Sequence, residues 1–210
     1  MTEPLYQMDS YLREFSATVV AHDADANAVA LDRSAFYPGG GGQPHDVGWL
    51  RVREESLPVK KLVRQGDQLW HVVEGNLPPV GATVTGCLDW DLRYKLMRTH
   101  TALHVLCGVV WRDYGALVTG GNMEPLKGHM DFEFESLQRE LVAEIETKVN
   151  AEIEAAHPIS VGILPRTEAF QIPDLIRTKI NLLPESITQV RIVEIEGLDL
   201  QADGGTHVAN

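Results

Sequence analysis

Two histidines four residues apart are the first residues of this chain that could do chemistry. His100 and His104 lie in the segment R-T-H-T-A-L-H, which has the composition of a helix. Residues at this spacing share one helix face, so both imidazoles can reach a single metal ion. No glutamate follows His100, so the H-E-x-x-H pattern of metalloproteases is absent. The pair alone leaves two interpretations open: a metal site, or two polar residues at the edge of a core helix.

A second pair of ligand types lies near the end of the chain. Asp203 and His207 are also four residues apart, in the segment Q-A-D-G-G-T-H-V. Two adjacent glycines place them on a turn, whose backbone freedom could direct both side chains toward one point. Two helical ligands and two loop ligands would make a tetrahedral site. An ordinary Asp-Gly-Gly turn is the other interpretation, but two such pairs in one chain favour a metal.

The third feature is a run of glycines in the segment F-Y-P-G-G-G-G-Q-P, residues 36–44. Four consecutive glycines cost backbone entropy, so a structural or functional requirement is expected for them. They permit close approach of the backbone to a ligand and can direct N–H groups at an anionic or carbonyl oxygen. A flexible hairpin loop is the alternative. No Lys-Ser/Thr pair follows, so this is not a Walker loop.

Elements of two kinds must position these residues. The first 90 residues contain short β-type runs separated by turn signals, which predicts a small barrel or curled sheet. Beyond residue 90, a helix capped by Asp91 and ended by Gly115 carries the histidine pair. The expected strands are 17–20, 28–31, 49–52, 68–73, 83–88, 116–118, 129–134, 159–164 and 189–195, with further helices at 136–156 and 167–177 and a hairpin turn in or just after 119–122.

This order of elements predicts an α+β fold. We expect a small N-terminal β-barrel-like domain over residues 1–90, followed by a two-layer α+β domain over residues 91–210. The strong apolar stripe of the helix at 136–156 includes Leu137, Leu141 and Ile145. Cys107 lies seven residues after His100, a rise of about 10 Å, and is expected in the core rather than at the metal.

The charge restricts the classes of partner. Eighteen Lys and Arg residues against 30 Asp and Glu residues give a net charge of −12. Proteins that bind long nucleic acids usually carry a continuous basic surface instead. Composition alone therefore favours a small-molecule enzyme or a binding module. No apolar run is long enough for a membrane span, the N-terminus does not resemble a secretory signal, and Cys87 and Cys107 form no disulfide framework. We expect a reduced, cytoplasmic protein.

The three motifs together carry a resemblance to a known family. F-Y-P-G-G-G-G-Q, H-T-A-L-H and D-G-G-T-H-V occur in the order and spacing of the editing domain of alanyl-tRNA synthetases. The chain resembles still more their freestanding relatives, the alanyl-tRNA editing proteins of the AlaX type. The resemblance runs from about Leu31 to Val208. Relatives usually continue into a further strand past the position of Asn210.

The resemblance implies a zinc site and a reaction. The family's H-x-x-x-H and C-x-x-x-H ligands map onto His100, His104 and His207, with Asp203 where the family has cysteine. Carboxylate and thiolate carry the same charge, so we expect the Zn²⁺ to be retained, with lower affinity and wider metal choice. The implied activity is trans-editing hydrolysis of Ser-tRNA(Ala), and often of Gly-tRNA(Ala), at the acceptor end. No residue is identified as a general base.

The resemblance also implies substrate contacts. Ser34 stands where relatives have a hydroxyl residue, often threonine, and Gln43 is a second candidate for contacting the aminoacyl group, together with the glycine loop. The alternative is that Ser34 ends a strand and Gln43 caps a turn. Basic residues at the start of the metal helix could touch acceptor-stem phosphates, although such clusters are usually solvated. The expected substrate contacts are Ser34, Gly40, Gly41, Gly42 and Gln43, and the expected tRNA contacts are Arg93, Lys95 and Arg98.

Two other functions are compatible with the sequence. A metal-dependent hydrolase of another ester or amide gains weight from the negative charge and from Asp203. A metal-free module that binds tRNA or a protein partner is the alternative from a different class.

Overall fold

The computed structural model describes residues 1–134, 136, 138–181 and 183–210. It is a mixed α+β, sheet-rich fold that contains a closed six-stranded barrel. The chain forms two compact units, Met1–Leu96 and Met97–Asn210, and each is described by itself. The predicted division of function at residue 90 stays a prediction.

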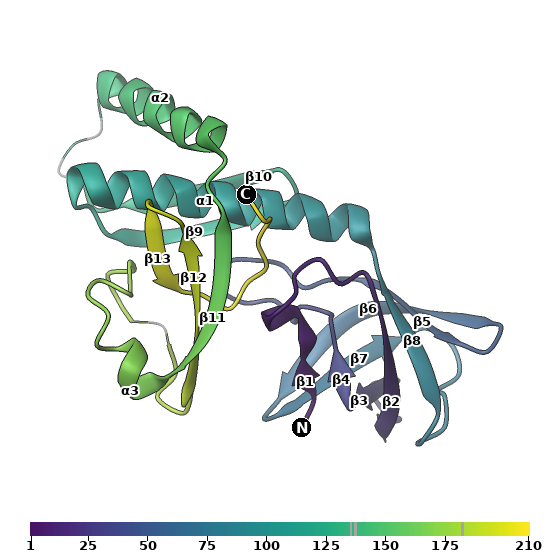
Figure 1. Cartoon of the computed structure of the whole chain (residues 1–210). Coiled ribbons are helices and arrows are strands. Elements are labelled where there is room, and N and C mark those ends of the chain that lie inside the picture. The colour runs from purple at the N-terminus through teal and green to yellow at the C-terminus, as the bar shows by residue number, and fades with distance from the viewer. Residues whose placement is uncertain (135, 137, 182) are drawn as a thin grey trace. The chain divides into compact units, whose positions relative to one another are not determined.

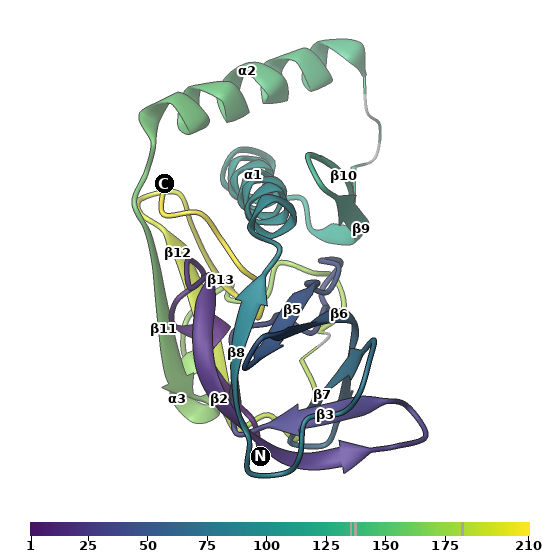
Figure 2. The same ribbon diagram turned by 90° about the vertical axis from the view of Figure 1, so that its right-hand side faces the viewer.

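The first unit is the barrel (Figures 1 and 2). Its strands follow the order β2-β3-β7-β6-β5-β8, and antiparallel pairing of β8 with β2 closes the ring. A short parallel pair, β1 with β4, and the 3₁₀ helix η1 accompany it. The bounds are β1 Glu3–Pro4, η1 Leu5–Gln7, β2 Glu14–Asp23, β3 Ala28–Leu31, β4 Arg33–Ser34, β5 Gly48–Val52, β6 Glu55–Gln65, β7 Gln68–Val73 and β8 Thr83–Leu88.

The barrel interior is filled by side chains from alternate residues of its strands. In β7 every second residue is buried, so Leu69, His71 and Val73 point into the interior. Gly86 of β8 is required by packing, because a Cβ there would lie 2.3 Å from the ring of Phe15. The predicted barrel is confirmed. Strand β6 was missed because it contains Pro58, a residue that argues against a strand interior.

The second unit contains two antiparallel sheets and the helices α1 to α3 (Figure 1). Strands β9 and β10 form a hairpin, and β12 lies between β11 and β13 in a three-stranded sheet. Helix α1 begins within the first unit and continues into the second. The bounds are α1 Trp90–Tyr114, β9 Val118–Glu124, β10 Lys127–Phe132, α2 Arg139–Ala155, β11 Ile159–Pro165, α3 Arg166–Ala169, β12 Gln189–Ile195 and β13 Asp199–Ala202.

Helix α1 ends as predicted but is capped differently. Asp89, rather than Asp91, caps its start, since its Oδ1 accepts the N–H of Leu92 at 3.1 Å. Gly115 ends the helix with a φ of +65°, and its N–H donates to the carbonyl of Trp111.

The predicted hairpin is confirmed: residues 119–122 belong to β9, and the turn follows just after them at Pro125 and Leu126, where Leu126 has a φ of +61°. Two other elements differ from the predictions. The helix expected at 167–177 is the four-residue α3, because Pro173 interrupts any longer helix. Strand β13 was not predicted, since D-L-Q-A carries no β-branched residue.

Helix α2 packs by the predicted apolar stripe. Ile145 joins Val110 of α1 in a buried cluster, with Leu141 and Val149 packed against it. Leu137, expected in the same stripe, lies outside the described residues. Within the described part of the chain, no helix is long and apolar enough to cross a membrane.

Candidate metal centre

Helix α1 and the loop after β13 bring the four predicted ligands together. His100 and His104 lie one turn apart on α1, and Asp203 and His207 follow β13. One donor atom from each side chain lies within 4.8 Å of the other three. All four side chains are largely buried.

The three Nε2 atoms surround the carboxylate of Asp203. Asp203 Oδ1 lies 3.6 Å from His100 Nε2 and 4.0 Å from His104 Nε2, while Oδ2 lies 3.0 Å from His207 Nε2. Tetrahedral ligands ~2.0–2.1 Å from a zinc ion are about 3.3 Å apart. Three imidazoles and one carboxylate form an accepted zinc donor set, so the residues present fit such an ion.

Burial sets the protonation of the cluster. It lowers the pKa of His100, His104 and His207 to about 4, so all three imidazoles are neutral at pH 7 and keep a lone pair for a cation. Burial by itself raises the pKa of Asp203. Attraction to the histidines in their protonated forms and the hydrogen bond with His207 outweigh this effect and hold the pKa well below its usual value. Arg191 Nη1 lies 3.6 Å from Asp203 Oδ2 and also favours the anion.

The D-G-G motif is a turn closed by its own aspartate. Asp203 Oδ2 accepts the N–H of Gly205 at 2.7 Å, which folds the loop back toward α1. In the described structure neither Gly204 nor Gly205 has a positive φ, so the expected use of unusual glycine angles is wrong here. The hydrogen bond made by Asp203 is the physical reason for the turn.

A threonine on α1 orients His207, the last of the candidate ligands. Thr101 Oγ1 lies 3.1 Å from His207 Nδ1 and accepts the N–H of Val208 at 3.2 Å. The ring of His207 is thereby held with Nε2 toward Asp203. Sequence reasoning missed Thr101, although its place one residue after His100 was the available signal.

The glycine run forms a tight turn in the first unit. Gly39, Gly40, Gly41 and Gly42 all have positive φ, between +56° and +137°. Gly40 and Gln43 exchange two backbone hydrogen bonds of 3.0 and 2.9 Å, the pairing of a two-residue hairpin turn around Gly41 and Gly42. Only glycine adopts this sequence of angles cheaply. The predicted contacts of Gly40, Gly41, Gly42 and Gln43 with substrate stay predictions.

Ser34 is enclosed in the barrel. Its Oγ lies 2.8 Å from His71 Nε2 and accepts the N–H of Phe36 at 3.2 Å. His71 Nδ1 lies 3.3 Å from the carbonyl of Val29, so the ring donates there and Nε2 accepts the proton of Ser34. In this structure the hydroxyl serves internal hydrogen bonds, and its contact with substrate stays a prediction.

Arg93 is buried, which contradicts its predicted role as a tRNA contact. Its Nε donates to both carboxylate oxygens of Asp46 at 2.9 and 3.1 Å, and its Nη2 donates to Asp46 and, at 2.6 Å, to the carbonyl of Ala35. Asp46 also accepts the N–H of Tyr37, beside the glycine run. Arg93 therefore holds the F-Y-P-G-G-G-G loop. No sequence pattern indicates that Asp46, 47 residues earlier, pairs with this guanidinium.

The other two basic candidates remain on the surface. Lys95 Nζ lies 2.6 Å from the exposed carboxylate of Asp91, and Arg98 is exposed one turn later on α1. Their contact with tRNA stays a prediction.

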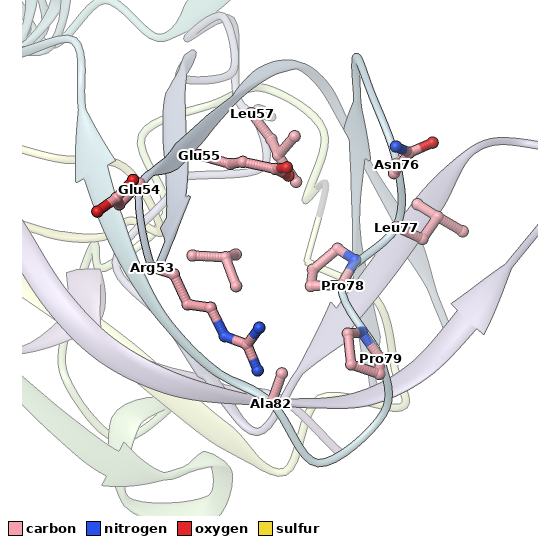
Figure 3. Close-up of a pocket in the computed structure, with 10 residues that line it drawn as sticks. Arg53, Glu54, Glu55, Leu57, Asn76, Leu77, Pro78, Pro79 and Ala82 are labelled. Carbon is pink, nitrogen blue, oxygen red and sulfur yellow. The ribbon is translucent and has the colours of Figure 1, made fainter.

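A pocket of about 620 Å³ lies at one end of the barrel (Figure 3). The turn between β5 and β6 and the segment before β8 line it, with Arg53, Glu55, Pro78 and Pro79 facing the opening. None of its lining residues is a predicted ligand or substrate contact.

Comparison with known proteins identifies the family. Residues 7–92 match the family model of class II (A) tRNA synthetases. The alanyl-tRNA editing protein AlaX-M of Saccharolobus solfataricus is 39% identical over 213 residues, which cover all of this chain and 88% of the relative. AlaX-M of Methanosarcina acetivorans is 41% identical, over all of this chain and 89% of the relative. The alanine–tRNA ligase of Pyrobaculum arsenaticum is 37% identical over 99% of this chain and 24% of the ligase. The chain therefore belongs to the family of alanyl-tRNA editing proteins, which are aminoacyl-tRNA deacylases.

Proposed function

We propose that this chain hydrolyses mischarged tRNA(Ala) in trans, with Ser-tRNA(Ala) as the first substrate and Gly-tRNA(Ala) as the second. The reaction adds water to the ester carbonyl, breaks its bond to the ribose oxygen of the terminal adenosine, and releases the free amino acid and uncharged tRNA. The observation that carries the proposal is the His100, His104, Asp203 and His207 cluster in a chain similar over its full length to editing proteins.

In this proposal those four residues hold one Zn²⁺. When bound, the ion would supply Lewis acidity, by lowering the pKa of a water or by polarising the ester carbonyl. Neutral imidazoles and an ionised carboxylate are the protonation states that such an ion needs. Burial favours the neutral imidazoles, and Arg191 favours the ionised carboxylate. Asp203 brings the same negative charge as the cysteine of the motif it resembles.

We further propose a division of function along the chain. Residues 1–90 would present Ser34, the glycine turn and Gln43 to the aminoacyl end, and residues 91–210 would hold the metal. Lys95 and Arg98 would contact phosphates near the acceptor end. A site that rewards the hydroxyl of serine would spare alanine, which lacks it. Glycine lacks the hydroxyl too, so we expect Gly-tRNA(Ala) to be hydrolysed more slowly than Ser-tRNA(Ala).

A metal-dependent hydrolase of a smaller ester or amide is the second candidate. The net charge of −12 favours it, because a polyanion is repelled at long range.

The test compares substrates on one metal-replete sample. Ser-tRNA(Ala), Gly-tRNA(Ala), Ala-tRNA(Ala) and small amino-acid esters such as serine methyl ester would be assayed together. The proposal predicts rapid loss of serine from tRNA(Ala) with alanine spared. Hydrolysis of the small esters without hydrolysis of any charged tRNA would establish the second candidate instead.

A further inference from the structure

A buried carboxylate lies behind the metal cluster and has no part in the proposed reaction. Asp199 is the first residue of β13 and is 6% exposed. Its Oδ2 lies 3.9 Å from His104 Nδ1, the ring nitrogen opposite the one that faces Asp203. The carboxylate thus stands on the outer side of a candidate ligand.

The fold holds Asp199 in this place from two sides. Gln201 Nε2 donates to Asp199 Oδ2 at 2.5 Å, and Arg177 Nη2 lies 3.3 Å from Asp199 Oδ1. The guanidinium of Arg177 itself rests over the ring of Trp111 at 4.9 Å. These contacts fix the direction of the carboxylate toward α1.

A glycine on α1 lets the carboxylate approach. Gly108 lies one turn after His104, and a Cβ at this position would be 2.9 Å from Asp199 Cβ and 3.1 Å from Leu198 Cγ. Any larger residue would push the start of β13 away from the helix. The close approach of Asp199 to His104 is therefore built into α1.

Several polar atoms of His104, Asp199 and Arg177 lack a hydrogen-bond partner. Within the described structure, His104 Nδ1, Asp199 Oδ1 and Arg177 Nε are buried and make no hydrogen bond. Buried polar atoms are normally satisfied by a protein group or an ordered water. A shift of about 1 Å, or one bridging water, would join the imidazole to the carboxylate.

We propose that Asp199 is a positioning residue of the metal centre. Its carboxylate accepts the Nδ1 proton of His104, directly or through one water, and so fixes the tautomer whose Nε2 lone pair faces Asp203. Carboxylates that orient ligating histidines in this way are a general device of metal sites. This inference rests on the metal centre of the proposed function.

The first experiment measures zinc affinity by competition with a chromophoric chelator, which requires no substrate. Asp199→Asn keeps the shape of the side chain and removes its charge. Glu194→Gln is the matched control, because it removes the same charge from an exposed position on β12. We expect about 10- to 100-fold weaker zinc binding for Asp199→Asn and unchanged binding for the control.

The zinc affinities distinguish a failure of the role of Asp199 from a failure of the proposed metal centre. Tight zinc binding by the wild type, with equal affinity in Asp199→Asn, would overturn the role of Asp199 and leave the metal centre standing. Failure of the wild type to bind zinc would overturn both.

A second measurement uses the wild type alone, in case Asp199→Asn does not fold. Nitrogen-15 NMR of labelled histidine in the zinc-free protein reports the tautomer of His104, with His104→Gln for assignment. We expect the proton on Nδ1. A proton on Nε2 would overturn the inference.

Discussion

In the proposed metal centre, the side chain of Asp203 differs in kind from the other three candidate ligands. The three neutral imidazoles around it offer only lone pairs, so its carboxylate supplies the single negative charge among the four candidate ligand groups. A carboxylate oxygen is a harder donor than a thiolate sulfur. A site with a carboxylate ligand therefore binds other divalent ions besides zinc more readily than a site with a thiolate ligand does.

Replacing Asp203 by cysteine should therefore tighten zinc binding. We expect Asp203→Cys to bind Zn²⁺ about tenfold more strongly, and to prefer it more over Mn²⁺, because thiolate is the softer ligand. Asp203→Ala, which removes the charge, should bind neither ion well. Competition titrations of the three proteins measure this, and equal affinities would show that residue 203 is not a ligand.

The Asp203→Cys substitution should also make the activity of the protein sensitive to oxidants. Burial raises the pKa of Cys107 to about 12, and Cys87 is also buried, so the wild type presents no reactive thiolate. In this test peroxide is applied to the zinc-free proteins and removed, and deacylation is measured after zinc is added back. The wild type should recover its full rate, whereas Asp203→Cys should stay inactive until a thiol reductant has also been added. Loss of wild-type activity at the same rate would contradict this account.

His71 should make stability depend on pH. Burial lowers its pKa to about 4, below the ~6.5 of an unfolded histidine, so the folded state binds this proton less tightly. Its contribution to the free energy of unfolding is full above about pH 6.5 and is lost as the pH falls toward 4, at ~1.4 kcal/mol per pH unit. Urea unfolding of zinc-free wild type and His71→Gln from pH 4.5 to 7.5 tests this. The free energy of unfolding should change less with pH in His71→Gln than in the wild type. Equal slopes for the two proteins would contradict this role of His71.

Helix α1 organises the second unit at the scale of elements. One face of the helix carries His100 and His104. Thr101 contacts and orients His207, and Gly108 leaves the space in which Asp199 approaches the helix. The helix and its histidine pair followed from spacing, because one face of a helix is a local property of the sequence. The meeting with Asp203 and His207 was predicted from ligand types and family resemblance. Asp199 and Arg191 were not, since their approach depends on the pairing of β12 with β13.

The buried ion pair of Arg93 and Asp46 should govern the stability of the barrel unit. Removing one partner leaves the other charge buried, so Arg93→Met should cost about 3–5 kcal/mol of unfolding free energy. Lys95→Met, an exposed change two residues along α1, should cost almost nothing. Chemical denaturation of both variants tests the contrast. Wild-type stability in Arg93→Met with weakened tRNA binding would restore the surface role.

Under the proposed function, the whole molecule would bind a polyanion while carrying a net charge of −12. A protein of this kind is expected to touch tRNA at a small number of phosphates near the reacting end. The net charge alone could not place these contacts, because a count of charged residues does not show which side chains are buried. Arg93 is the example, since burial removes it from the surface.

The salt dependence of tRNA binding should therefore be shallow. We expect a plot of log affinity against log salt whose slope corresponds to about two to four phosphates. Filter binding of uncharged tRNA(Ala) between 50 and 200 mM salt measures it, with Lys95→Met and Arg98→Met as variants that should each reduce the slope. A slope equivalent to about eight phosphates would require a basic surface that this account does not contain.

A metal ion held by His100, His104, Asp203 and His207 should be required for editing. The most direct test is to add zinc stepwise to chelator-treated protein while measuring bound metal and the rate of Ser-tRNA(Ala) deacylation on the same sample, with His207→Ala beside it. We expect a rate that rises in proportion to bound zinc up to one ion per chain, and a rate on the order of a thousandfold lower in the variant. Full activity of the metal-free wild type would contradict it.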